Sequence, residues 1–422
     1  MRSGLSRSAP LFKLLWIAAA FSLTAMNGCG ENSGGGVELS AHQSWDSAGV
    51  VVTVTPLWTH DAQVIHLEEA DGSLVASEDG QPLRFLAIDD VRRWGEDHIA
   101  VLESNTGKVR RISLADGSID SFGALGDGPG EFRRPTRLVP IAHDSLGIWD
   151  SSNRRITIPG PAAQGYREVS LHPDRLPQGL PTGGVVPVAG LPDGSLLTRA
   201  SRTPDEEGLV VQEVAFFRLE GDERRSEEVF TTVGDELWTE MRIDEGRAAR
   251  MTYPLPFGRR LNLTVSDGGT FILAGPGHDE LQVRGTDDGE LVRIHRFPSP
   301  GETVSDESIE RDAEALGRAG VDEATKAAIV DRAHDVSVGR ERPLFGDVVA
   351  GSDGRIWLGD YVNTPGFSQR WLLMERDGAI TMEVKLPEAA QLVHAWDDQV
   401  LLAESTPEGD YMLRLVDVSP WM

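Results

Sequence analysis

The chain has 422 residues, enough by length alone for two or three average domains. Its 67 Asp and Glu residues outnumber its 40 Lys and Arg residues, which gives a formal net charge of −27 at pH 7. This acidity argues against a nucleic-acid partner, because a phosphate backbone needs clustered cations, and against charge-driven binding to an anionic lipid surface. Hydrophobic residues make up 40% of the chain, so we expect a packed core rather than a disordered acidic tail.

The cysteine and turn-residue content narrows the class of protein further. Cys29 is the single cysteine, so one chain can form neither a disulfide framework nor a cysteine-based zinc site. The 46 Gly and 24 Pro residues, with many Asp-Gly pairs, indicate a turn-rich and mostly β protein.

The first 28 residues have the pattern of a secretion signal. Residues 1–13 contain Arg2, Arg7 and Lys13 and no acidic residue, and an apolar run follows over 14–26. This run is too short to span a bilayer comfortably, which takes about 20 residues. A basic segment followed by a short apolar segment therefore predicts a signal peptide over residues 1–28.

The end of this segment, Met26-Asn27-Gly28-Cys29, resembles a bacterial lipobox. The resemblance implies cleavage before Cys29, a lipid on its thiol and anchoring to the cell envelope. No Asp follows Cys29, so in a Gram-negative cell the resemblance implies the outer membrane, facing the periplasm or the cell surface. The Gly- and Ser-containing segment 29–48 is expected to be a flexible tether. The alternative is ordinary secretion, with Cys29 as a bystander.

A repeated unit predicts the fold. It consists of an Asp-containing turn, a short apolar strand and a terminal residue that is usually polar. Its six copies are Asp97–Glu103, Asp144–Asp150, Asp193–Arg199, Asp267–Leu273, Asp353–Asp360 and Asp398–Glu404. Three of the spacings between copies lie near 45–50 residues, which suits a four-stranded propeller blade.

Two longer spacings contain insertions. A charged stretch covers residues 202–250, and a helical insertion is expected at about 303–336. Ser305 or Asp306 would cap a first helix containing Ile309, and Asp322 would cap a second helix containing Ala327, Val330 and Ala333. Further strands are expected at Val50–Thr55, Val109–Ser113, Arg155–Ile158, Val210–Arg218, Leu281–Gly285, Leu291–Phe297, Trp371–Arg376, Met382–Leu386 and Met412–Val418.

Six units predict an all-β fold, a six-bladed β-propeller with a short helical insertion, over residues 49–419. A blade cannot bury both faces of its sheet alone, so the blades must close into a ring as one domain. Closure of such a ring usually combines both chain ends in one blade. We therefore expect Val50–Thr55 to complete the last blade beside Tyr411–Val418.

The segment Gly126-Asp-Gly-Pro-Gly-Glu-Phe132, with Pro135, is followed by Asp150-Ser-Ser-Asn153-Arg-Arg-Ile156. This arrangement resembles the bacterial six-bladed β-propeller lipoproteins related to NHL-repeat proteins. Asp46–Val50, Arg342–Phe345 and Asp353–Trp357 add weaker similarity. The resemblance extends loosely over residues 50–419, departs from the pattern in blades three and four, and implies fold and location more than activity.

Four carboxylates form the candidate site. If the repeated strand is the innermost strand of each blade, its terminal residues surround one mouth of the central channel. The acids there are Glu103, Asp150, Asp360 and Glu404. Converging carboxylates could bind a hard cation such as Ca²⁺ or supply a general base. The alternative is a solvated rim, or one paired with Arg, for example Asp150 with Arg154 or Arg155.

Other motifs favour structural roles. The glycines at 126, 128 and 130 predict a tight turn with positive φ, since the spacing fits no phosphate-binding loop. The ten His residues show no metal-binding spacing, and no nucleophile elbow is present. Trp149, Trp357, Trp371 and Trp396 are expected between blades rather than on a carbohydrate platform.

Two functions remain open from the sequence. The first is a monomeric, lipid-anchored binding or scaffold module for a protein, peptide or glycan partner, with no nucleic acid and no assigned cofactor. The second is a metal-dependent propeller hydrolase, lactonase or lyase with an acidic site at the channel mouth, for which Ca²⁺ is the candidate ion.

Overall fold

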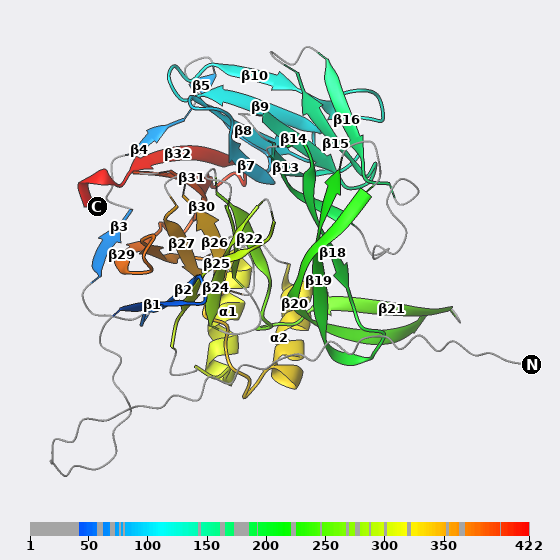
Figure 1. Cartoon of the computed structure of the whole chain (residues 1–422), viewed down its shortest axis with the longest axis vertical. Coiled ribbons are helices and arrows are strands. Elements are labelled where there is room, and N and C mark those ends of the chain that lie inside the picture. The colour runs from blue at the N-terminus through cyan, green and yellow to red at the C-terminus, as the bar shows by residue number, and fades with distance from the viewer. Residues whose placement is uncertain are drawn as a thin grey trace, which may run out of the picture. The chain divides into compact units, whose positions relative to one another are not determined.

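β-Strands dominate the structure, and most of them belong to six sheets of four to six strands (Figure 1). The computed structural model describes residues 42–421 except 57–61, 68–71, 76, 79–80, 142–144, 161–164, 173–184, 192, 221–224, 245–246, 267–269, 275–278, 287, 299–301, 319–321, 352–353, 363–367 and 397. The predicted signal peptide 1–28, Cys29 and most of the predicted tether lie outside the described residues. The described residues all belong to one unit, Ser40–Met422.

The six sheets follow one another along the chain. The first holds β7 (Asp90–Arg93), β8 (His98–Glu103), β9 (Lys108–Ser113) and β10 (Ile119–Phe122). The second holds β13 (Pro135–Ile141), β14 (Ser145–Asp150), β15 (Arg155–Pro159) and β16 (Tyr166–Ser170). The third holds β17 (Val185–Gly190), β18 (Leu196–Arg202), β19 (Gly208–Glu220), β20 (Arg225–Asp244) and β21 (Arg247–Pro254).

The second half of the chain continues this order. The fourth sheet holds β22 (Asn262–Val265), β23 (Thr270–Ala274), β24 (Glu280–Gly285) and β25 (Leu291–Arg296). The fifth holds β26 (Phe345–Ala350), β27 (Ile356–Asp360), β28 (Arg370–Met374) and β29 (Ile380–Lys385). The sixth holds β30 (Ala390–Ala395), β31 (Gln399–Ser405) and β32 (Tyr411–Asp417).

Hydrophobic clusters join neighbouring sheets. One cluster packs Trp357 and Trp371 of the fifth sheet against Val400 of the sixth. Another joins the sixth sheet to the first, because Trp396 and Leu401 belong to the same cluster as Ile99. Trp149 likewise lies between the second and third sheets, so these Trp residues pack between sheets as predicted.

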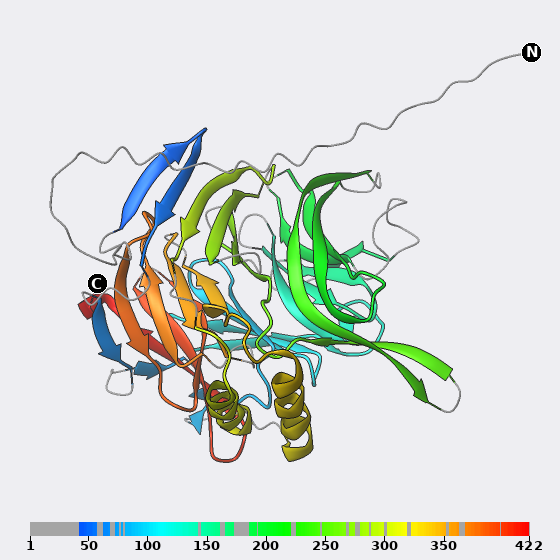
Figure 2. The same ribbon diagram turned by 90° about the horizontal axis from the view of Figure 1, so that it is seen from below.

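The sheets have the arrangement of a β-propeller. Apart from the N-terminal strands β1 to β4, the strands within each sheet pair antiparallel in chain order, and the first strands of neighbouring sheets contact one another toward the middle (Figures 1 and 2). The prediction of an all-β propeller is therefore confirmed, while the ring of six blades stays a prediction. The repeated sequence unit corresponds to the second strand of each sheet, β8, β14, β18, β23, β27 and β31.

The N-terminal strands correct the predicted closure. β2 (Val50–Val54) pairs parallel with β25 of the fourth sheet, not with β32 of the last sheet. β1 (Gln43–Ser47) extends β2 as a hairpin, and β3 (Gln63–His66) pairs parallel with β29. The strand that lies beside β32 is β4 (Gly72–Leu74). The segment 43–74 thus crosses the outer edges of three successive sheets before the first sheet begins.

The helical insertion is confirmed. α1 (Asp306–Arg318) and α2 (Glu323–Val336) lie side by side between β25 and β26 in the chain (Figures 1 and 2). The Ser305 hydroxyl accepts from the amide of Ser308 at 3.2 Å, and the carboxylate of Asp322 accepts from the amide of Thr325 at 3.0 Å, so both predicted caps form. Of the apolar residues expected on the second helix, Ala333 is buried and Ala327 is exposed. Among the described residues, no helix is long and apolar enough to cross a membrane.

The charged stretch 202–250 is an extension of the third sheet. β19 and β20 pair along most of their length, and β20 continues into a hairpin with β21 that projects from the rest of the sheet (Figures 1 and 2). The strand expected at Val210–Arg218 is part of β19, and the extra length expected between the third and fourth repeats lies in these long strands.

The glycine-rich turn has the predicted structural role. It connects β11 (Ala124–Leu125) to β12 (Glu131–Phe132), which pair with each other. Gly130 has φ of 75°, and a Cβ there would lie 2.3 Å from the ring of Tyr166. The remaining two-stranded ribbon is formed by β5 (Ser77–Glu78) and β6 (Gln81–Pro82), and a 3-10 turn, Ser419–Trp421, ends the described chain.

Candidate functional site

The four carboxylates predicted from the repeat lie at or near the ends of second strands, not of innermost strands. Glu103 ends β8, Asp150 ends β14, Asp360 ends β27 and Glu404 lies near the end of β31. Most contacts across sheets are made by the first strands, β7, β13, β17, β22, β26 and β30. The prediction assumed that these acids end the innermost strand of each sheet. They lie at or near the end of the next strand outward, so the assumption was wrong.

Two of these acids form ion pairs within their own sheets. Glu103 is buried and accepts from Nε of Arg110 on the adjacent strand at 2.7 Å. Glu404 accepts from Arg414 of β32 through Nε at 2.7 Å and lies 2.6 Å from its Nη2. These contacts match the arginine-paired alternative.

Asp150 is fully buried and organises a turn. Its Oδ2 accepts from the amide of Arg133 at 2.8 Å and from Nδ2 of Asn153 at 2.9 Å. Its Oδ1 accepts, each at 3.1 Å, from the amides of Arg134, Ser152 and Asn153. Five donors thus satisfy one carboxylate and join the loop before β13 to the turn after β14. The expected ion pair of Asp150 with Arg154 or Arg155 is not formed.

Burial raises the pKa of Asp360 to about 6, an effect that Arg370 and Arg342 oppose. Such a pKa suits a general base near neutral pH. Its charged neighbours are these two arginines with Glu383 and Glu302, rather than the other candidate acids. Within the described part of the chain, no three His, Cys, Asp or Glu residues are placed to hold a metal ion, so the four carboxylates do not form a Ca²⁺ site together.

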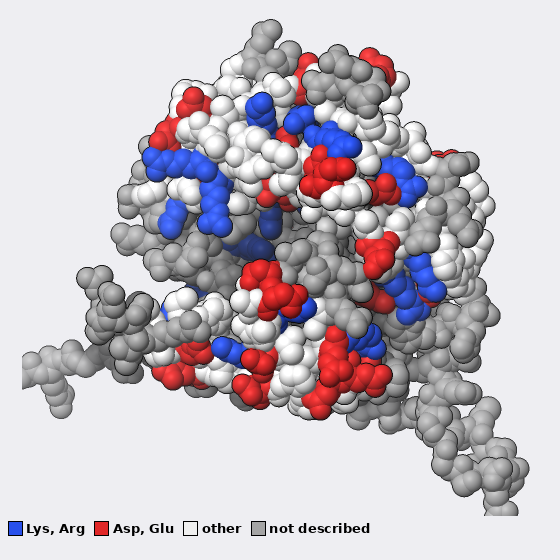
Figure 3. All heavy atoms as spheres, turned by 180° about the vertical axis from the view of Figure 1, so that it is seen from behind, with Lys and Arg blue, Asp and Glu red and all other residues white. Residues whose placement is uncertain are grey.

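A central cavity of about 210 Å³ lies among the first strands of four sheets. Its polar lining comes from Asp89, Asp90, Arg92, Thr136 and Arg137. Its apolar lining comes from Leu138, Val188, Leu263 and Val265. These residues lie at or beside β7 and on β13, β17 and β22. The space-filling view from behind shows a recess near the middle, with Lys or Arg atoms deep inside it (Figure 3).

The two acids of the central cavity already have partners. Asp89 accepts from the amide and the hydroxyl of Ser104, both at 2.7 Å. Asp90 accepts from the amide of Leu138 at 2.8 Å, which links β7 to β13, and its other oxygen lies 3.5 Å from Nε of Arg92. Both carboxylates therefore serve the structure of the cavity wall.

Arg137, which also lines the central cavity, differs from Asp89 and Asp90 in its surroundings. Among the described residues, no side chain or carbonyl forms a hydrogen bond or ion pair with its guanidinium group. Burial lowers the pKa of Arg137 to about 10; the nearby guanidinium groups of Arg199 and Arg92 lower it further, and Asp90 opposes this. Burial also lowers the pKa of Arg199, with Asp235 opposing. The guanidinium groups of Arg92 and Arg199 thus lie close enough to Arg137 to repel its charge.

Buried His394 extends this arrangement on β30. Burial and the charges of Arg92 and Arg93 lower its pKa to about 3, so it is neutral at pH 7. The sequence prediction reached Arg199 at the end of a repeated unit, on the second strand β18, but missed Arg92 and Arg137, which lie on the first strands β7 and β13. The sequence signal that could have indicated this site is the charged Arg137 within the mostly apolar strand 135–141. Its closeness to Arg92 and Arg199 could not be predicted, because the three residues come from three different sheets.

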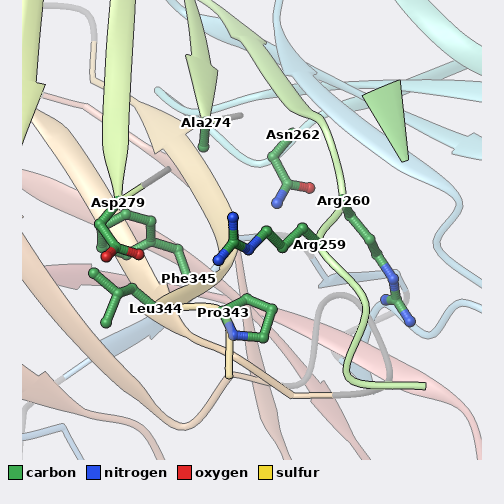
Figure 4. A pocket seen from close by; sticks show the side chains of 8 residues that line it. All are labelled: Arg259, Arg260, Asn262, Ala274, Asp279, Pro343, Leu344 and Phe345. Atoms are coloured by element: carbon green, nitrogen blue, oxygen red, sulfur yellow. The ribbon is translucent and has the colours of Figure 1, made fainter. Parts of the chain in front are cut away.

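A second, smaller pocket lies between the fourth and fifth sheets, beside the segments that precede them (Figure 4). It has room for about 20 Å³ beside Arg259, Asp279, Pro343 and Phe345. Nη2 of Arg259 lies 2.9 Å from Oε2 of Glu341. A space of this size is enough for a single water molecule, which needs about 10–15 Å³, but not for a larger group, so this pocket is not a ligand site.

Comparisons with known proteins add likeness of fold. No family model matches the chain, and no curated protein matches its sequence. An exported protein from Bacteroides fragilis NCTC 9343 is similar in structure with a TM-score of 0.46 and 11% identity, over 85% of this chain and 99% of that one.

Two further solved structures show the same kind of likeness. Regucalcin from Agrobacterium tumefaciens, described as a calcium-binding protein, has a TM-score of 0.41 and 11% identity over 84% of this chain and 96% of its own. Virginiamycin B lyase from Staphylococcus aureus, in an inactive form with quinupristin, has a TM-score of 0.38 and 12% identity over 82% and 99%. These values are too low to carry a ligand or an activity over to this chain.

Proposed function

We propose that this protein is an exported, lipid-anchored β-propeller of the bacterial cell envelope that binds a partner through its central cavity. The signal segment and Cys29 would place it on the membrane, and the tether 29–48 would hold the propeller away from the lipid. The partner is a protein, peptide or glycan that inserts a small group into the cavity.

The observation that supports binding is the central cavity itself. Four sheets contribute its walls, so the lining is held by strands rather than by loose loops. Its carboxylates are engaged with Ser104 and Leu138, whereas Arg137 has no partner among the described residues. A rigid wall with an unengaged polar group suits recognition of a ligand.

The metal-dependent hydrolase is the alternative, and no contact of the described residues favours it. Glu103, Asp150 and Glu404 are each occupied by Arg or amide donors, as given above. Asp360 alone has a pKa suited to proton transfer, and one carboxylate provides only a weak cation site.

Localisation is tested with Cys29→Ala. The expected result is that wild-type protein fractionates with membranes and the variant is released into the soluble fraction, because the lipidated residue is lost. Labelling with a fatty-acid probe should detect the wild type only. A variant that still fractionates with membranes would contradict the lipid anchor.

Partner binding is tested by capture from membranes with the anchor intact, comparing wild type with Thr136→Trp. Thr136 is exposed and lines the cavity, so Trp should fill the space without disturbing the core. We expect at least a tenfold loss of the captured partner. Ser121→Trp, on the exposed outer strand β10, is the matched control and should capture as wild type does. Equal capture by Thr136→Trp would show that the partner does not use the cavity.

A further inference from the structure

Arg137 in the wall of the central cavity forms no ion pair with the described residues, and Arg92 has only Asp90, 3.5 Å from its Nε. Arg137 and Arg92 line the cavity, and Arg199 lies close enough behind Arg137, on β18, to act on it electrostatically. Nε of Arg92 is buried and makes no hydrogen bond with the described residues. Neither guanidinium that lines the cavity is neutralised by a close bidentate carboxylate.

Burying guanidinium groups close together costs free energy when no anion is bound between them. Each buried guanidinium loses hydration, and like charges near one another repel more strongly where water is partly excluded. The local acids compensate only in part: Asp89 accepts from Ser104, and Asp90 accepts from the amide of Leu138 and has its other oxygen 3.5 Å from Nε of Arg92. Arg137 is therefore the charged group of the cavity lining that makes no hydrogen bond or ion pair with the described residues.

We propose that Arg137, with Arg92 beside it and the charge of Arg199 behind it, binds an oxyanion group of the ligand: a carboxylate, phosphate or sulfate. The proposal rests on the proposed function, because it specifies the chemistry of the group that enters the cavity. The planar guanidinium forms two parallel hydrogen bonds to such a group, which an ammonium cannot reproduce.

The size of the cavity limits the ligand. About 210 Å³ corresponds to roughly seven water molecules at about 30 Å³ each in the liquid. This space accommodates a small free acid or the charged end of a larger molecule. The apolar residues Val188, Leu263 and Val265 on the opposite strands would contact the uncharged part of the same group.

The test measures binding of inorganic phosphate, sulfate and succinate to the purified full-length chain by calorimetry at pH 7, with ionic strength held constant by sodium chloride. We expect saturable binding of at least one of them. Arg137→Gln should weaken this binding about tenfold or more. Arg137→Lys should restore only part of the affinity, because Lys keeps the positive charge but cannot form the two parallel hydrogen bonds of a guanidinium group. Arg202→Gln is the matched control, since Arg202 lies on the same strand as Arg199, is exposed and pairs with Glu213 at 2.9 Å.

Folding is checked by circular dichroism. Arg137→Gln removes a charge that its neighbours repel, so its melting temperature should be no lower than that of the wild type. No saturable binding of the three anions, or equal binding by wild type and a folded Arg137→Gln, would overturn the proposal.

The two proposals fail separately. If Thr136→Trp loses the captured partner but Arg137→Gln keeps it, the cavity binds a ligand and the oxyanion inference is wrong. If the anions bind through Arg137 but Thr136→Trp still captures the partner, the oxyanion site stands and the proposed route of partner binding is wrong. Competition of phosphate or succinate with the captured partner would show that the partner's own charged group occupies the site.

Discussion

At the scale of single residues, the buried acidic residues of this chain mostly stabilise the fold. Glu103 and Glu404 neutralise arginines of neighbouring strands, and Asp150 accepts from five donors. A buried carboxylate with this many donors is costly to replace, because its loss leaves backbone amides without acceptors. Glu103, Asp150 and Glu404, three of the four acids that the repeat marked as a site, are therefore important to stability rather than to ligand binding.

Asp150→Ala should lower the free energy of unfolding by about 3–5 kcal/mol, because four backbone amides and the Asn153 side chain lose their acceptor. Asp150→Asn retains one carbonyl oxygen and should lower it by less. Urea unfolding followed by Trp fluorescence measures both. Asp127→Ala, in the glycine-rich turn before β12, is the control, since Asp127 is exposed and forms a surface ion pair with Arg133, and its effect should be much smaller than that of Asp150→Ala. Similar effects of the Asp150 and Asp127 variants would contradict the role of Asp150.

At the scale of elements, the strand β2 is attached to the fourth sheet through a buried polar contact. The hydroxyl of Thr53 lies 2.6 Å from Nδ1 of His295 on β25, and the hydroxyl of Thr55 donates to the carbonyl of Gly378 at 2.7 Å. Gly378 has φ of 98°, and a Cβ there would lie 2.7 Å from both Thr53 and His295. The contact therefore joins β2, β25 and the turn before β29.

This contact gives a pH dependence whose sign is set by His295. Burial, with help from Arg293 and His42, lowers its pKa to about 3, below the unfolded value near 6.5. The folded state keeps His295 neutral while the unfolded state takes up a proton, so stability is lost as the pH falls below about 6.5.

His295→Gln should remove this contribution. Between pH 7 and 5 the wild type should lose up to about 2 kcal/mol more than the variant, at 1.36 kcal/mol per pH unit below 6.5. Urea unfolding at a series of pH values measures the two slopes. His66→Gln, an exposed position on the peripheral strand β3, should have the slope of the wild type. Parallel slopes for wild type and His295→Gln would contradict the assignment.

At the scale of the whole molecule, the first and last sheets are joined by a short N-terminal segment. β4 pairs with β32, and Phe85 and Tyr411 exchange backbone hydrogen bonds of 2.9 and 2.8 Å. Phe85 is buried in the cluster that contains Ile99 of the first sheet and Leu401 of the last. Closure therefore depends on a hydrophobic contact as well as on strand pairing.

Phe85→Ala should lower the free energy of unfolding by about 3–5 kcal/mol, because it leaves a cavity where the two sheets meet. Leu86→Ala is the adjacent control: Leu86 is 70% exposed, and its loss should change stability by less than about 0.5 kcal/mol. Hydrogen exchange should show faster exchange of amides in β4 and β32 in Phe85→Ala. Unchanged exchange there would indicate that closure does not depend on Phe85.

Local patterns predicted most of the strands within one or two residues. The strand expected at Leu291–Phe297 is β25, Leu291–Arg296, and the one at Arg155–Ile158 is β15, Arg155–Pro159. Alternating apolar residues and Asp-Gly turns act over short distances, so they can be recognised without the fold. The partner of an edge strand cannot be recognised this way, and β2 was assigned to the wrong sheet because any free edge offers the same backbone donors and acceptors.

The sequence by itself determined the propeller class, the two capped helices and the structural nature of the glycine-rich turn, because each depends on residues close together in the chain. Only the tertiary structure decided which strand of each sheet faces the middle, which edges the N-terminal strands join and where positive charge collects. Arg92, Arg137 and Arg199 come from three sheets, and their mutual repulsion exists only after those sheets meet. The acidic site predicted from the repeat was misplaced for the same reason. Its residues lie on the second strand of each sheet, where side chains contact neighbouring strands, and not on the first strand, which faces the channel.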